Sequence, residues 1–363
     1  MLDGGQVLVL QSNGIVEAIV PASEAGDGVE VLEGILCPGF INAHCHIELS
    51  HLKNKIVERT GLVDFVQQVM TGREATAVVK NAAMEAAVEE LYNSGTVAVG
   101  DICNTADSVQ LKQGSKMRWR NFIEVSGFVD AVATKRMEAV EAIASQFPGS
   151  VVTPHSPYSV SKTLFRLLNE RTRNAIISIH NQEAAAENEL YENKQGAFLE
   201  LYKNLGIDIS AFAATGKTSL QTWLPYFDQQ QSIIAVHNSF TSKADMDFAD
   251  QYAAARLYYC ICINANLYIE DHLPPVELLL QQNQTIVMGT DSYASNWQLD
   301  MMAEIKTIQK HFPAIPLSSI LQWATLNGAR ALGMDDQLGS FEKGKQPGVV
   351  VIDEGNMRAR RLL

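Results

Sequence analysis

Short apolar segments alternate with longer segments of mixed polarity over most of the chain. Eight apolar segments have the length and β-branched character of strands, at 39–46, 96–103, 119–125, 151–155, 176–180, 233–237, 257–263 and 285–291. The stretches between them have helical character, at 64–79, 82–92, 131–146, 162–173, 185–205, 244–255, 275–282 and 299–311. Strand and helix in alternation indicate parallel βα units. Eight such units predict an α/β fold of the TIM type, a (β/α)8 barrel.

The alternative α/β fold is a doubly wound open sheet. It would usually need fewer strands and would carry a glycine-rich phosphate-binding turn after the first strand. No such turn follows the segment 39–46. The pattern therefore favours the closed barrel.

Both ends of the chain read as β structure. The runs 6–10 and 15–20 flank Asn13-Gly14, a strong hairpin-turn signal, and strand character returns at 29–36. The tail 344–353 is again strand-like, and we expect it to pair with the hairpin. This predicts a small β-sandwich domain from residues 1–38 and 337–363, and a barrel from residues 39–336. The connection between Glu183 and Ile233 is long for one βα unit, so it predicts an extra helix or a lid.

Composition narrows the class of protein. Apolar residues make up 47% and charged residues 19%, as in ordinary globular proteins, and the formal net charge is −13. The negative charge argues against binding nucleic acid or anionic membranes. The start has no signal-peptide pattern, and no apolar run approaches the ~18 residues of a membrane span. Five scattered cysteines without a Cys-x-x-Cys motif argue against a disulfide framework, so we expect a cytoplasmic protein.

Polar residues gather where the predicted strands end. Five of the eight histidines close a strand, namely His44, His46, His155, His180 and His237, and Asp291 closes the last strand. The carboxyl ends of barrel strands form the active site in enzymes of this architecture. A single histidine at such a position is more often structural, but five together predict an active site.

His44 and His46 lie two residues apart on one strand, so their side chains point to the same face. A lone His-x-His pair also occurs on ordinary surfaces. Together with His180 and Asp291, the pair matches a metal site of three imidazoles and one carboxylate, with a position left for water. We therefore predict one divalent metal, zinc or ferrous iron.

A metal of this kind lowers the pKa of water, and a nearby base must take the proton. Glu183 follows His180 by three residues, where a loop can direct it into the same pocket. Asp291 can share the proton, and His237 can orient Asp291 or the water. The alternative for Glu183 is a solvated acid at a helix N-terminus.

The motifs carry a family resemblance over nearly the whole chain. They are PGFINAHCH (38–46), PHSPYS (154–159), HNQE (180–183), VHNSF (236–240), GTDS (289–292), ATLNGA (324–329) and GSFEKGK (339–345). In combination they resemble the aminohydrolase branch of the amidohydrolase superfamily, which includes guanine deaminase, cytosine deaminase-like enzymes and s-triazine hydrolases. Members of that family usually begin with another strand before the hairpin, so we expect a trimmed β domain or an incomplete start.

The resemblance implies roles for matching positions. The metal ligands would be His44, His46, His180 and Asp291. The catalytic groups would be Glu183 as proton shuttle, His237 beside the water or leaving group, and Asp291. His155 would contact the substrate. Binuclear members use a strand-4 lysine, which is absent here, and this favours one metal. Glu124 on strand 3 is a ligand in another subtype, although a structural role suits it better.

The reaction implied is hydrolytic deamination of an amino-substituted heterocycle, by attack of hydroxide generated at the metal and release of ammonia. Glu48 follows the first motif and would accept hydrogen bonds from a ribose or an amine; a loop acid without such a role is the alternative. The pattern His-x-His-x-Glu-x-Ser resembles the aminodeoxyfutalosine deaminases of menaquinone biosynthesis. Guanine, methylthioadenosine/S-adenosylhomocysteine and s-triazine hydrolases are the neighbouring alternatives.

Further pocket residues are expected at the strand ends, namely Tyr158, Asn266, Ser292 and Trp297, although such residues often serve packing alone. Cys260 and Cys262 are better explained as small apolar core residues than as a metal pair. Dimers are frequent in the family, so a homodimer is one expected state.

Two other classes of function remain as alternatives. A non-catalytic barrel that binds a metal or ligand would have lost Glu183 or a ligand, and neither is lost here. An amidase or cyclic-amide hydrolase would need the strand-4 lysine.

Overall fold

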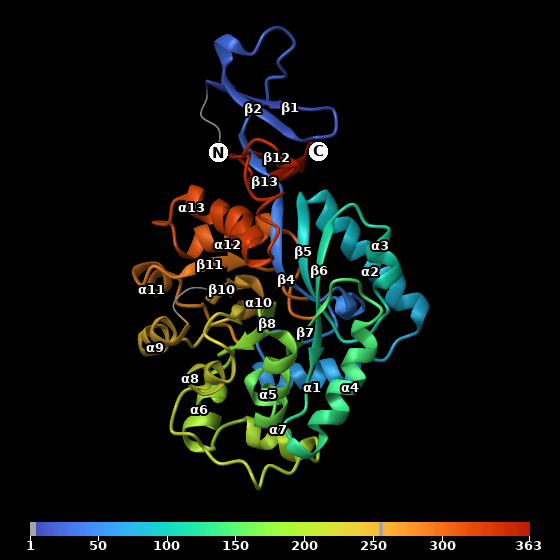
Figure 1. Ribbon diagram of the computed structural model, residues 1–363, viewed down its shortest axis with the longest axis vertical. Coiled ribbons are helices and arrows are strands. Elements are labelled where there is room, and N and C mark those ends of the chain that lie inside the picture. The colour runs from blue at the N-terminus through green and yellow to red at the C-terminus, as the bar shows by residue number, and fades with distance from the viewer. Residues whose placement is uncertain (1–4, 254–256) are drawn as a thin grey trace.

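A computed structural model describes residues 5–253 and 257–363 of the chain. Eight parallel strands form its centre (Figure 1): β4 (Phe40–Cys45), β5 (Thr96–Cys103), β6 (Arg118–Val125), β7 (Val151–Pro154), β8 (Ile176–Asn181), β9 (Ser232–His237), β10 (Leu257–Ile261) and β11 (Thr285–Met288). They pair in chain order as two sheets of four, β4–β7 and β8–β11.

Two seams close these sheets into a barrel. At the first seam, between β7 and β8, the His180 backbone N–H donates to the His155 carbonyl at 2.9 Å. At the second seam, the backbone N–H groups of Thr290 and Asp291 both donate to the His44 carbonyl at 3.1 Å, and Cys45 bridges Asp291. The predicted (β/α)8 barrel is confirmed.

Helices surround the strands (Figure 1). They are α1 (Leu62–Gly72), α2 (Ala77–Asn93), α3 (Val109–Gln113), α4 (Ala133–Ala144), α5 (Lys162–Thr172), α6 (Ala185–Asn193), α7 (Phe198–Asn204), α8 (Ser219–Trp223), α9 (Lys243–Ala253), α10 (Ile263–Ile269), α11 (Val276–Gln281), α12 (Met301–His311), α13 (Leu317–Gln322) and α14 (Gly328–Ala331). Every residue of β4 and β5 is buried. Strands that are covered on both faces have continuous apolar sequences, which explains why the strand segments lack an alternation of apolar and polar residues.

A small sheet draws its strands from both ends of the chain. β12 (Val349–Asp353) pairs antiparallel with β3 (Ile35–Pro38) and with β13 (Arg358–Arg361). The predicted Asn-Gly hairpin is confirmed as β1 (Gln6–Leu10) and β2 (Val16–Pro21). In Figure 1 these strands lie at one end of the molecule, and α6 and α7 lie at the other.

Two expectations about this sheet were wrong. The strand predicted at 29–36 is confined to Ile35–Pro38. The tail strand pairs with β3, and only its leading residues reach the hairpin, through hydrogen bonds that join Val16 to Gly344 and Lys345. The division of the chain into residues 39–336 and its two flanking segments stays a prediction.

Several helix boundaries differ from the sequence pattern. The segment 64–79 breaks before Thr76, whose side chain caps α2 by accepting from the Val79 backbone N–H. The segment 185–205 breaks after Asn193, where Lys194 adopts a left-handed conformation. The expected extra helix between Glu183 and Ile233 is present as α8. The end of the segment 244–255 lies outside the described residues.

Candidate metal centre and active site

The four predicted ligands meet at the carboxyl end of the barrel. The ligand atoms of His44, His46, His180 and Asp291 all lie within 4.8 Å of one another, and all four residues are buried. The Nε2 atoms of His44 and His46 are 3.1 Å apart. The Oδ1 atom of Asp291 lies 3.5 Å from the first and 3.4 Å from the second. Residues from opposite sides of the closing seam thus aim their donors at one point.

These separations fit a single metal ion. Two ligands bound at about 2.1 Å, with bond angles between right-angled and tetrahedral, lie about 3.0–3.4 Å apart. Burial lowers the pKa of His44 to about 4 and holds that of His46 well below its usual range, so both rings are neutral and able to bind a metal. Burial by itself would raise the pKa of Asp291, but its hydrogen bond to His44 and the surrounding histidines lower it, and the carboxylate is ionised.

Neighbouring groups fix the orientation of two of the ligands. The His180 Nδ1–H donates to the His155 carbonyl at 2.8 Å, which leaves Nε2 for the metal. The Ser295 hydroxyl donates to Oδ2 of Asp291 at 2.6 Å, which leaves Oδ1 for the metal. Such outer contacts set the tautomer and the basicity of metal ligands.

A second group of potential ligands adjoins the first. Glu124, His155 and His180 also bring ligand atoms within 4.8 Å of one another. However, Nδ1 of His180 is already committed to a backbone carbonyl, and Nδ1 of His155 is hydrogen-bonded to the hydroxyls of Ser159 and Ser156 at 2.7 and 2.9 Å. One carboxylate oxygen of Glu124 accepts from the Asn104 amide at 2.8 Å. The hydrogen bonding favours one metal, bound by the first group.

Glu183 stands beside the metal site without belonging to it. It is buried, and its Oε1 lies 3.5 Å from Nε2 of His237. Burial raises the pKa of Glu183 well above its usual range. A carboxyl group held in its protonated form can donate a proton at neutral pH. The His237 ring is fixed by its Nδ1–H, which donates to the Asn266 side chain at 2.8 Å.

The backbone at the strand ends is bent to present these side chains. His237 has a φ of 74° and Asp291 a φ of 57°, in the left-handed region that non-glycine residues rarely adopt. Such conformations cost on the order of 1–3 kcal/mol each and persist where the surroundings impose them. Here the local backbone turns out of the strand direction at two of the residues with predicted roles.

The remaining predicted residues occupy different places. The Glu48 carboxylate accepts from the backbone N–H groups of Asn104 and Thr105, and burial raises its pKa to about 7. Tyr158 lies edge-on to His155, with ring centroids 5.7 Å apart, and stacks on Phe198.

Three further pocket candidates are engaged by protein groups. Ser292 hydrogen-bonds Ser295 at 3.0 Å within the loop after β11, and Asn266 supports His237. Trp297 is 38% exposed and donates to Glu58. Cys260 and Cys262 are both buried in the barrel core, as expected.

Sequence reasoning missed the groups that support the ligands. One of these groups is Ser295. The others are Asp101 and Lys112, whose Oδ2 and Nζ atoms lie 2.5 Å apart in a buried ion pair. The other oxygen of Asp101 accepts from the Ile47 backbone N–H at 2.9 Å, next to His46. Asp101 lies near the end of a predicted strand, and this position was the available signal.

We expect purified protein to contain about one divalent metal per chain, because the two ligand groups found among the described residues share His180, which has a single ring nitrogen left for a metal. His180→Ala should weaken metal binding by at least about 100-fold, since loss of an outer partner alone costs 10–100-fold. Elemental analysis after dialysis against a chelator measures both quantities.

The matched control is His311→Ala, which changes an exposed histidine at the end of α12 and should leave metal content unchanged. Two metals per chain would contradict the assignment of one site.

Comparisons with known proteins agree with this architecture. A family model described as "Amidohydrolase family" matches residues 35–360. The chain is 26% identical to a 5-methylthioadenosine/S-adenosylhomocysteine deaminase of Teredinibacter turnerae, over 96% of this chain and 80% of the relative. It is 24% identical to a 5'-deoxyadenosine deaminase of Methanococcoides burtonii, over 96% and 79%.

Solved structures share the fold. Aminofutalosine deaminase of Helicobacter pylori, in complex with methylthio-coformycin, superposes with a TM-score of 0.80 at 21% identity, over 95% of this chain and 86% of that one. An adenosine deaminase of Xanthomonas campestris with bound zinc gives a TM-score of 0.74 at 22% identity, over 96% and 80%. Within the described residues, no helix is both long and apolar enough to cross a membrane.

Proposed function

Because the chain belongs to the amidohydrolase family, we propose that it is a metal-dependent hydrolase that deaminates purine nucleosides. The observation that carries this proposal is the buried Glu183 carboxyl group, 3.5 Å from His237 Nε2, beside a cluster of three histidines and one aspartate. Deamination of a purine ring requires a nucleophilic water at the carbon that bears the amino group and a proton donor at the adjacent ring nitrogen. The site offers a group for each requirement.

The residues of the chain divide the work. His44, His46, His180 and Asp291 would hold a divalent ion, which would supply a water of lowered pKa. Glu183 donates its proton to the ring nitrogen, so that negative charge does not accumulate there, and can then accept a proton and pass it to the departing amine. His237, held by Asn266, presents Nε2 toward Glu183.

The substrate class follows from the relatives. The curated relatives named above act on 5-methylthioadenosine, S-adenosylhomocysteine or 5'-deoxyadenosine, all of which are adenine nucleosides altered at the 5' position. We propose that this chain acts on the same class. Aminodeoxyfutalosine, the substrate suggested by the pattern around Glu48, is our specific candidate within it and would place the enzyme in menaquinone biosynthesis.

Other parts of the proposal rest on chemistry or resemblance. Zinc is the metal we propose, since nitrogen-rich ligand sets suit it, and ferrous iron is the alternative. His155, Glu48 and Tyr158 lie around the same mouth and are proposed to contact the nucleoside, together with Asn266 and Ser292 through the loops they support. A cytoplasmic location and a homodimer stay predictions from the sequence.

A screen for ammonia release tests the substrate class. We expect turnover with aminodeoxyfutalosine, methylthioadenosine, S-adenosylhomocysteine and 5'-deoxyadenosine, and little with guanine, cytosine or amino-triazines. The control is the same protein stripped of metal, which should release none.

Turnover of guanine or a triazine in preference to every nucleoside would contradict the proposed class and favour the neighbouring hydrolases. Activity on the other nucleosides but none on aminodeoxyfutalosine would contradict only the specific candidate.

A further inference from the structure

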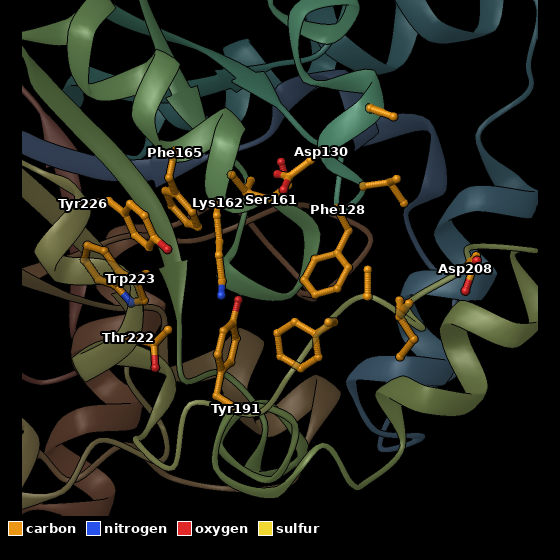
Figure 2. A pocket seen from close by; sticks show the side chains of 16 residues that line it. Phe128, Asp130, Ser161, Lys162, Phe165, Tyr191, Asp208, Thr222, Trp223 and Tyr226 are labelled. Atoms are coloured by element: carbon orange, nitrogen blue, oxygen red, sulfur yellow. The ribbon is translucent and has the colours of Figure 1, made fainter.

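A cavity of about 300 Å³ lies beside the barrel mouth, apart from the metal centre. Its walls come from the segment after β6, the start of α5, and the long connection between Glu183 and Ile233. None of the metal ligands, and neither Glu183 nor His237, lines it. Figure 2 shows the side chains around it.

The walls are aromatic. Six rings line the cavity, namely Phe128, Phe165, Tyr191, Phe212, Trp223 and Tyr226. Several rest against one another, such as Phe165 and Tyr226, which stack with centroids 5.3 Å apart. A flat aromatic ligand would gain both buried area and ring–ring contacts between such walls.

One free cation reaches the cavity. The Lys162 side chain, from the first turn of α5, extends into it (Figure 2). Within residues 5–253 and 257–363, its ammonium group has no ion-pair or hydrogen-bond partner. The two carboxylates of the rim are engaged, since Asp130 accepts from the Thr163 backbone N–H at 2.9 Å and Asp208 from that of Ser210 at 2.8 Å.

Two of the wall residues also hold the active site. The Trp223 indole N–H donates to Asn181, the neighbour of His180, at 2.8 Å. The Tyr191 hydroxyl donates to the Pro157 carbonyl at 2.7 Å, two residues after His155. The cavity is therefore separate from the metal centre but built on the segments that support it.

We propose that this cavity is a second ligand site, which takes a small planar aromatic carboxylate. The ring lies between the aromatic walls, and the carboxylate pairs with Lys162. A charge-assisted contact of this kind is among the stronger polar interactions in proteins.

Calorimetric titration of the metal-loaded protein with benzoate tests the proposal. We expect saturable binding of one benzoate per chain, with benzamide, which lacks the charge, binding at least about 10-fold more weakly. Lys162→Met should remove this preference. Ala211→Trp, at an exposed position of the lining, should fill the cavity and abolish binding of both compounds while metal content stays normal.

Lys135→Met is the matched control, since it removes an exposed lysine of α4 that does not line the cavity. It should leave benzoate binding unchanged. Benzoate that binds equally well to the Lys162→Met protein is bound elsewhere, for example at the metal, and would overturn the proposal. Tighter binding of benzylamine than of benzoate would also overturn it, because the site would then select cations.

Discussion

Replacing Glu183 with glutamine is expected to slow ammonia release by about 10²–10⁴-fold, the usual contribution of a positioned acid or base. The amide keeps the size and hydrogen-bonding reach of the side chain but has no acidic proton to give. Metal content should stay near that of the unaltered protein, because Glu183 is not among the four clustered ligands. Steady-state rates and elemental analysis on the same preparation measure the two effects.

Glu187→Gln supplies the control for this prediction. Glu187 is also fully buried, lies four residues further along the chain, and accepts from the Gln182 backbone N–H at 2.8 Å. Glutamine can still accept that hydrogen bond, so the rate should change by only a few-fold. Equal losses of ammonia-release rate in the two variants would show that the rate depends on a buried carboxyl group at either position. They would contradict a specific role for the proton of Glu183.

Lys112→Met is expected to lower the free energy of unfolding by about 3–5 kcal/mol, because it leaves the Asp101 charge buried and unpaired. Burial by itself lowers the pKa of Lys112 and raises that of Asp101, but the 2.5 Å contact with Asp101 raises the pKa of Lys112 overall, which keeps its ammonium group charged. Lys112 also donates to the Asn121 side chain at 2.7 Å. Chemical denaturation monitored by circular dichroism measures the loss.

The double variant Asp101→Asn/Lys112→Met separates the charge from the packing. It removes both charges and retains an oxygen that can accept from the Ile47 N–H, so it should recover part of the lost stability. Lys243→Met breaks an exposed ion pair with Asp247 and should cost less than about 1 kcal/mol. A single Lys112 variant as stable as this control would contradict a buried, ionised pair.

The sequence predicted the metal cluster because barrel topology brings all strand ends to one mouth. His44 and His46 share a face by the two-residue period of a strand, and His180 and Asp291 each follow a recognisable apolar run. Once eight parallel strands are inferred, convergence of these four residues needs no further information. The distances among their donor atoms bear this out.

The supporting groups followed from no such rule. Ser295 reaches Asp291 only because the loop after β11 folds back on itself, and a serine four residues away carries no periodic signal. Lys112 is a helical lysine like any other until α3 packs it against Asp101. The break before Thr76 was missed because the helical pattern in the sequence continues through it. In the structure the Thr76 hydroxyl caps a new helix at this point.

The two seams of the barrel imply a structural role for the metal ion. His44 lies in β4 and His46 directly follows this strand of the first sheet, whereas His180 lies in β8 and Asp291 follows β11 of the second sheet. An ion held by all four would cross-link the two half-barrels, and would tie together positions more than 240 residues apart in the chain, such as His44 and Asp291. Closing so long a loop costs chain entropy. The ion would bind only where the four ligands are already together, so its binding free energy would stabilise the folded state and offset that cost. The same four side chains that bind the catalytic metal would therefore also stabilise the closed barrel.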